Sequence, residues 1–149
     1  HGRERARGFQ LVALDGDGAV LMHMGVLSTI GYASPRNFLH IVLDNEGYVS
    51  TGRQESTSVT SSLEAVALAC RYRAVSRCAT SAELGDAVAR GLSTDGPHFL
   101  LCKVNQSHSR SLPRVTSHHT PEQNKRAFQT ALNEPRVLRL KAVPAGATR

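Results

Sequence analysis

The sequence predicts an α/β fold, a three-layer αβα domain with a mainly parallel sheet. Two observations support this prediction: short apolar runs without helical periodicity, and segments of about 10–14 residues with helical periodicity that alternate with them. Alternating strands and helices form parallel βαβ units, in which helices cover both faces of the sheet. The length of 149 residues and the hydrophobic content of 40% suffice for one compact domain with its own core.

Four apolar runs predict the strands. Each is bounded by polar or turn-forming residues, which is typical of buried strands in a parallel sheet. The runs cover residues 9–14, 38–43, 74–79 and 98–104. Residues 48–59 and 105–120 are rich in Ser and Thr and predict a loop and a linker.

The segments between and after these strands predict four helices. Val20, Met24 and Leu27 recur at helical spacing in the first helix. The second is rich in Ala, the third begins with an N-cap at Thr80 or Ser81, and the fourth has Pro121 at its first position. The predicted helices cover residues 19–32, 63–72, 81–91 and 121–132.

The net charge of +6 comes from the C-terminal end. Residues 1–108 hold ten basic and ten acidic residues, whereas residues 109–149 hold eight and two. These basic residues are scattered, and no nucleic-acid-binding motif accompanies them, so nucleic acid is not expected as a partner. We expect residues 1–107 to form the α/β core, and residues 108–149 to form a basic linker, C-terminal helix and tail that pack on the same domain.

Membrane and secretory segments are not expected. No apolar run approaches the roughly 18 residues of a membrane span, and the charged N-terminal residues lead into a short strand. Cys70, Cys78 and Cys102 lack the spacing of a metal site, so we expect buried free thiols. These features predict a cytoplasmic protein.

Two polar clusters follow the first two predicted strands. One is Gly16-Asp17-Gly18 and the other is Asp44-Asn45-Glu46-Gly47. A helix of 14 residues advances about 21 Å, and a strand of six residues returns about 20 Å. Since one such crossover separates the clusters, Asp17 and Asn45 should lie at the same edge of the sheet, close enough to share one ion.

These residue types suit Mg²⁺ bound to a phosphate group. Asp17 offers a carboxylate and Asn45 an amide oxygen, and an anionic ligand can complete the shell. Gly16 and Gly18 let the backbone approach a phosphate closely, and the N–H groups from Ala19 onward open a helix whose N-terminus favours an anion. The alternative is a simple strand-to-helix turn capped by Asp17. The second cluster at crossover distance favours the ion site.

The spacing of Gly16-Asp17-Gly18 and Asn45 resembles the thiamine diphosphate motif of decarboxylases and acetolactate-synthase-like enzymes. The resemblance implies that Asp17, Asn45 and the backbone carbonyl of Gly47 hold Mg²⁺, which grips the cofactor's diphosphate. Many members of this family have Asn where this chain has Asp44. That departure leaves the ligand Asn45 in place.

Further motifs resemble phosphonopyruvate decarboxylases and the β subunits of sulfopyruvate decarboxylases. The resemblance covers residues 9–133, with Arg53 as a departure where relatives often have Gly. The matching motifs are Leu14-Asp15-Gly16-Asp17-Gly18-Ala19, Leu21-Met22, Val42-Leu43-Asp44-Asn45, Ser50-Thr51-Gly52-x-Gln54 and Pro121-Glu122-x-Asn124-Lys125-x-Ala127-Phe128.

The resemblance implies a carboxy-lyase that decarboxylates a phosphonopyruvate-type 2-oxo acid with thiamine diphosphate and Mg²⁺. In such enzymes the activating Glu comes from a pyrimidine-binding domain or α-type subunit, so no catalytic residue is assigned in this chain, and a homo- or hetero-oligomer is expected. Three alternatives stay open: a sulfopyruvate decarboxylase β-type subunit, a cofactor-binding fragment or pseudoenzyme without turnover of its own, and acetolactate-type carboligation.

The loop after Asn45 offers candidate substrate contacts. Ser50, Thr51 and Gln54 can hydrogen-bond a phosphonate or sulfonate and Arg53 can pair with one, although such loops are often only solvated. Tyr48 is interpreted as facing the cofactor or as packing.

Other polar residues are interpreted as structural. Asp44 either orients Asn45 or is a turn residue. We interpret His40 as a hydrogen-bonded core histidine, and His23 as a packing residue or as one that supports a ligand of the site. The histidines of the linker, for which we expect a structural or exposed role, are His108, His118 and His119.

Overall fold

The computed structural model describes residues 10–106 and 118–133. The chain divides into two compact units, residues 1–107 and 108–149. Within the second unit the described residues form one helix, α5 (Pro121–Asn133), preceded by a short turn. That the C-terminal part packs on the α/β core stays a prediction.

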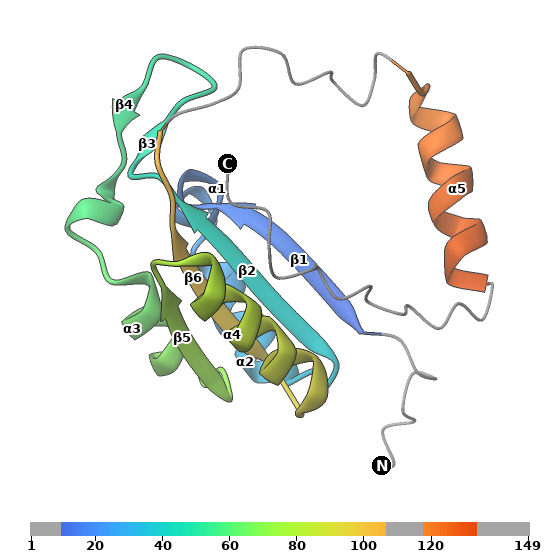
Figure 1. The fold of residues 1–149 in the computed structure, drawn as a ribbon, viewed down its shortest axis with the longest axis horizontal. Helices are drawn as coiled ribbons and strands as arrows, with labels where there is room; N and C mark the ends of the chain where they lie inside the picture. Colours follow the sequence, from blue (N-terminus) through green and yellow to red (C-terminus); the bar gives the residue numbers. More distant parts are fainter. Residues whose placement is uncertain (1–9, 107–117, 134–149) are drawn as a thin grey trace. The chain divides into compact units, whose positions relative to one another are not determined.

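The first unit is built on a four-stranded sheet in which all neighbouring strands are parallel (Figure 1). The order across the sheet is β1-β2-β6-β5. The strands are β1 (Leu11–Gly16), β2 (Phe38–Asp44), β5 (Ala74–Cys78) and β6 (His98–Lys103). This arrangement confirms the predicted α/β fold class.

Helices cover both faces of this sheet (Figure 1). On one face α2 (Gly25–Ala33) and α3 (Leu63–Ala69) bury Leu27 and Leu63 against Phe99. On the other face α4 (Ser81–Ser93) covers β5 and β6. Burying apolar side chains in both layers is the main force that holds the three layers together.

The register aligns the carboxyl ends of the central strands. Gly16 of β1 lies opposite Leu43 of β2, and Asp44 of β2 lies opposite Lys103 of β6. The residues that directly follow β1 and β2 therefore emerge side by side at one edge of the sheet, which is where open α/β sheets place their ligands.

The predicted helix 19–32 is two helices in the structure. The first, α1 (Asp17–Met22), begins directly after β1, and α2 follows after a break at His23. The break is a tight turn, in which His23 N–H donates to the Val20 carbonyl and Val26 N–H to the His23 carbonyl. Periodicity continues through this turn, so the apolar pattern alone does not reveal it.

The predicted loop 48–59 contains local structure. Two short strands, β3 (Gly47–Tyr48) and β4 (Gln54–Glu55), pair antiparallel and form a hairpin. A 3-10 turn, η1 (Thr57–Val59), follows and is N-capped by the hydroxyl of Ser56. Strands of two residues are too short to show the alternation by which strands are predicted.

The predicted cap of the third helix is present as a capping box. Thr80 Oγ1 accepts the Glu83 N–H, and the Glu83 carboxylate accepts the Thr80 N–H. The three cysteines are free, and burial raises the pKa of Cys102 to about 11. No helix in the described residues is long and apolar enough to span a membrane. The expected cytoplasmic location stays a prediction.

Candidate functional site

Two buried carboxylates lie where β1 and β2 end. Asp17 is the first residue of α1 and Asp44 is the last residue of β2, and each is 2% exposed. The hydroxyl of Ser58 contacts both, with its Oγ 3.2 Å from Asp17 Oδ2 and 2.8 Å from Asp44 Oδ1. The two strand ends are therefore joined by one side chain.

Among the described residues, the side-chain partners of Asp17 are hydroxyl groups. Its Oδ2 accepts hydrogen bonds from Ser56 Oγ and Ser58 Oγ. Within residues 10–106 and 118–133, Asp17 forms no ion pair and its Oδ1 accepts no hydrogen bond. Burying an ionised carboxylate without a counter-charge lowers the stability of a folded protein, so a cation bound at Asp17 would stabilise this arrangement.

Both carboxylate oxygens of Asp44 have hydrogen-bond or ion-pair partners. Lys103 Nζ lies 2.8 Å from its Oδ2, and its Oδ1 accepts the Ser58 hydroxyl and the Glu46 N–H. Burial alone raises the pKa of Asp44. The hydrogen bonds from Lys103, Ser58 and Glu46, with the charge of Lys103, outweigh burial and hold the pKa below its usual value. Asp44 therefore stays ionised within its own ion pair.

The turn after Asp44 contains the two remaining candidate ligands, the Asn45 side chain and the Gly47 backbone carbonyl. Asn45 is half-buried, and its Oδ1 accepts the Gly47 N–H at 3.1 Å. An amide oxygen has two lone pairs, so this hydrogen bond leaves one for another partner. Glu46 has a left-handed φ of 59°, and its carboxylate contacts Lys103. Lys103 thus holds both Asp44 and the strained residue of the turn.

The glycines of the motif have different surroundings. A Cβ at Gly18 would lie 2.5 Å from the ring of Tyr48, whereas the nearest atom to a Cβ at Gly16 would be the Leu43 carbonyl oxygen at 4.0 Å. Gly18 is therefore needed for Tyr48 to pack beside α1. Packing of Tyr48 against α1 is observed, whereas a contact of Tyr48 with the cofactor and the close approach of a phosphate at Gly16 stay predictions.

Of the candidate substrate residues, Ser50, Thr51 and Arg53 lie in the turn between β3 and β4, and Gln54 is the first residue of β4. Thr51 Oγ1 donates to Gln54 Oε1 at 3.0 Å and lies 3.2 Å from the Tyr48 carbonyl oxygen, so both side chains help to fold the hairpin. Arg53 is exposed, has a φ of 59° and takes part in no ion pair with the described residues. Ser50 is exposed.

The histidines do not form a metal centre in the described ranges. His40 is a buried core residue that lies 2.8 Å from Asp15 Oδ2 and 3.1 Å from the Tyr72 hydroxyl. His23, His118 and His119 are exposed, and His108 lies outside the described residues. Among the residues that the structure describes, no group of three or more His, Cys, Asp or Glu side chains could hold a metal ion.

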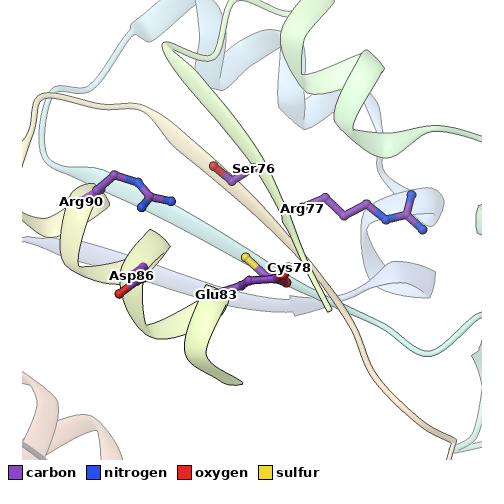
Figure 2. A pocket seen from close by; sticks show the side chains of 6 residues that line it. All are labelled: Ser76, Arg77, Cys78, Glu83, Asp86 and Arg90. Carbon is purple, nitrogen blue, oxygen red and sulfur yellow. The ribbon is translucent and has the colours of Figure 1, made fainter. Parts of the chain in front are cut away.

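A separate hollow lies beside β5 and α4, and Figure 2 shows the side chains that line it. It contains none of the residues predicted for the site, and the carboxylate of Glu83 is occupied by the capping box. The lining residues are Ser76, Arg77, Cys78, Glu83, Asp86 and Arg90. We assign this hollow no role in the site.

Sequence reasoning missed three residues of the site: Ser56, Ser58 and Lys103. The serines lie three and five positions after Arg53, in a segment rich in Ser and Thr. No spacing rule distinguishes them from the other Ser and Thr residues of that segment. Lys103 could have been predicted, because a charged residue at the end of an apolar strand emerges at the same edge of the sheet as Asp44.

Comparison with a family model matches residues 2–102 of this chain to the domain described as "Thiamine pyrophosphate enzyme, C-terminal TPP binding domain". The matched region contains the two strand ends, the hairpin and η1. The match therefore covers all the residues that the sequence predicts for the site, and it ends one residue before Lys103.

Curated relatives include two proteins named phosphonopyruvate decarboxylase. The one from Streptomyces viridochromogenes is 41% identical over 127 residues, and the one from Streptomyces hygroscopicus is 38% identical over the same length. Each alignment covers 84% of this chain but only 31% of the relative. The sulfopyruvate decarboxylase subunit beta of Methanococcus maripaludis is 34% identical over 134 residues, which cover 90% of this chain and 70% of that protein.

Proposed function

The chain belongs to the thiamine pyrophosphate enzymes, whose C-terminal TPP-binding domain it carries, and we propose that it supplies the Mg²⁺–diphosphate half of a thiamine diphosphate site. Its relatives are decarboxylases. The reaction that we propose for the assembled enzyme is decarboxylation of a phosphonopyruvate-type 2-oxo acid.

The metal assignment depends on one observation, the surroundings of the Asp17 carboxylate. It is a buried carboxylate with two hydroxyl donors on Oδ2, no ion pair in the described part of the chain, and an Oδ1 that accepts no hydrogen bond there. Mg²⁺ prefers oxygen ligands and usually takes one or two carboxylates together with phosphate oxygens. The donor set at this edge of the sheet fits that requirement.

The ligands we propose for Mg²⁺ are the Asp17 carboxylate, the Asn45 amide oxygen and the Gly47 carbonyl. The N–H groups of Gly18 and Ala19 belong to the first turn of α1, where the backbone has no partner within the helix, and they are proposed to face the diphosphate. Gly16 leaves room beside them, since no atom lies closer than 4.0 Å to the position of its Cβ.

When bound, thiamine diphosphate supplies the electron sink that carbon dioxide loss requires. The residues of this chain bind and orient it. Arg53 is proposed to pair with the acidic group at the far end of the substrate, with Ser50, Thr51 and Gln54 beside it, because Arg53 is an exposed cation without an ion pair among the described residues.

A partner must complete this site. We propose that a pyrimidine-binding domain or an α-type subunit provides the Glu that activates the cofactor, and that the active enzyme is an oligomer. The name of the Methanococcus maripaludis relative, subunit beta, supports a division of the enzyme between chains. The same relative supports sulfopyruvate as the alternative substrate.

Cofactor binding by the assembled protein tests the proposal. We expect Asp17→Asn and Asn45→Ala each to weaken Mg²⁺-dependent binding of thiamine diphosphate by more than about 100-fold, measured by isothermal titration calorimetry, because each removes a proposed ligand. Asp86→Asn, which neutralises an exposed acid on α4, is the matched control and should bind as the wild type does. Unchanged binding in both site variants would overturn the metal assignment.

A second experiment distinguishes an enzyme from a subunit without turnover. The chain is co-expressed with its partner, and carbon dioxide release is measured with phosphonopyruvate, sulfopyruvate and pyruvate. We expect release from the complex with one of the two acidic substrates and not from the chain alone. No release from the complex with any of the three would favour a cofactor-binding subunit without turnover, and acetolactate formed from pyruvate would favour carboligation.

A further inference from the structure

We propose that Ser58, supported by Ser56, is a positioning residue of the metal site, whose hydroxyl ties Asp17 to Asp44 and so sets the separation of the two strand ends. This inference rests on the proposed function. It adds a residue that neither the motif nor the sequence pattern assigns.

The contacts of Ser58 place it at the centre of the cluster. Its Oγ lies 2.8 Å from Asp44 Oδ1, 2.8 Å from Ser56 Oγ and 3.2 Å from Asp17 Oδ2. Ser56 is 1% exposed and gives its own hydroxyl to Asp17 Oδ2. The two carboxylates are thus bridged by a pair of hydroxyl groups from η1 and its cap.

Four oxygen–oxygen contacts join these residues: Ser56–Asp17, Ser56–Ser58, Ser58–Asp17 and Ser58–Asp44. Only two protons are available for them, because each serine hydroxyl carries one. The Ser56 proton goes to Asp17, and the Ser58 proton is shared between Asp44 Oδ1 and Asp17 Oδ2, with the shorter contact to Asp44. One hydroxyl group of Ser58 therefore hydrogen-bonds both carboxylates.

The backbone fixes the hydroxyl pair in place. Ser56 N–H donates to the Glu46 carbonyl at 3.0 Å, and Ser56 Oγ caps η1 by accepting the Ser58 N–H. Lys103 holds Asp44 and Glu46 from the other side. The chain of contacts from Lys103 through Asp44 and Ser58 to Asp17 is continuous.

This arrangement orients the ligand carboxylate before a metal arrives. Both hydroxyls contact Oδ2 of Asp17, so rotation of the carboxylate is restricted and Oδ1 is left for the ion. Residues that hydrogen-bond a metal ligand typically change metal affinity by about 10–100-fold when they are removed. We expect an effect of this size for the loss of the Ser58 hydroxyl.

The test is the Mg²⁺ dissociation constant of the protein assembled with its partner, measured by calorimetry at saturating thiamine diphosphate. Ser58→Ala should weaken Mg²⁺ binding by about 10–100-fold, and Ser58→Thr, which keeps the hydroxyl, should stay within about threefold of the wild type. Thr60→Ala is the matched control, because the Thr60 hydroxyl contacts only the Thr57 carbonyl within the described residues and should not affect Mg²⁺.

Ser58→Cys keeps the shape of the side chain with a slightly larger atom at its end and replaces a strong donor by a weak one. It therefore tests the role of the hydroxyl even if Ser58→Ala fails to fold. We expect it to weaken Mg²⁺ binding as Ser58→Ala does. Wild-type affinity in Ser58→Ala or Ser58→Cys, with binding lost in Asp17→Asn, would overturn the role of Ser58 and leave the proposed function standing. Wild-type affinity in Asp17→Asn would instead remove the proposed function.

Discussion

Asp17 and Asp44 are both 2% exposed, both lie where a strand of the sheet ends, and both contact the Ser58 hydroxyl. They differ in one respect. Asp44 faces the ammonium group of Lys103, whereas Asp17 faces only hydroxyl groups among the residues that the structure describes. Burial therefore does not distinguish the two acids, whereas the lack of a charged partner among these residues does, and it supports Asp17 as the proposed metal ligand.

Asp17 and Asp44 are expected to have different roles at this edge of the sheet. Lys103 pairs with both Asp44 and Glu46, and these ion pairs hold the turn that contains Asn45. Asp17 lies at the same edge and forms no ion pair with the described residues. The difference predicts that changes at Asp44 or Lys103 act mainly on stability, and that changes at Asp17 act mainly on binding.

Lys103→Met has the largest expected effect on stability. It leaves Asp44 buried without its counter-ion, so the free energy of unfolding should fall by about 3 kcal/mol in urea denaturation. The double variant Lys103→Met with Asp44→Asn should recover most of this loss. A single variant as stable as the wild type would show that the ion pair does not hold the turn.

Alkaline pH gives a second measure of the same ion pair. Burial lowers the pKa of Lys103, but the hydrogen bonds and charges of Asp44 and Glu46 outweigh it, so the pKa lies above the usual 10.5. The stabilisation is then fully present below about pH 10.5 and is lost as the pH rises through the raised pKa. The difference in unfolding free energy between wild type and Lys103→Met should be constant from pH 7 to pH 10 and narrow above it.

Gly18→Ala should lower the free energy of unfolding by about 2 kcal/mol, because a Cβ there would lie 2.5 Å from the Tyr48 ring. Gly16→Ala is the matched control. Its backbone is extended and the nearest atom to its Cβ would be 4.0 Å away, so stability should change by less than about 0.5 kcal/mol. Equal losses in thermal denaturation would contradict the difference between these glycines.

Among the substitutions that remove a charge, Asp17→Asn should have the smallest effect on stability. Without Mg²⁺ it removes a buried charge that has no counter-ion, so the free energy of unfolding should be unchanged or higher by about 1 kcal/mol. Asp44→Asn should lower it, because Lys103 then loses a charged partner. If Asp17→Asn destabilised the metal-free protein as much as Lys103→Met does, Asp17 would be a structural residue and the comparison between the two acids would fail.

The fold could be predicted from the sequence because its signals are local. Apolar runs and helical periodicity identify the four strands and most of the helices, and the length of one crossover brings Asp17 and Asn45 to the same edge of the sheet. The break at His23 and the β3–β4 hairpin could not be predicted in this way. They depend on tight turns whose hydrogen bonds leave the apolar pattern unchanged.

The environment of the site could be predicted only in part. The motif identifies Asp17 and Asn45, but Ser56 is 39 positions from Asp17, and Lys103 is 59 positions from Asp44. Pairings of this kind arise from the register of the sheet and the path of the loop, which a single sequence does not contain. The reason that Asp44 is tolerated beside Asn45 therefore appears only in the structure, where Lys103 neutralises it.

The position of the metal ion tests the central claim most directly. Crystals of the assembled protein with thiamine diphosphate and Mn²⁺ in place of Mg²⁺ would locate the ion by its anomalous diffraction. We predict one peak within bonding distance of the Asp17 carboxylate, the Asn45 amide oxygen and the Gly47 carbonyl, with the diphosphate completing its ligands. A peak elsewhere, with Asp17 still bound only to the two serines, would contradict the proposed site.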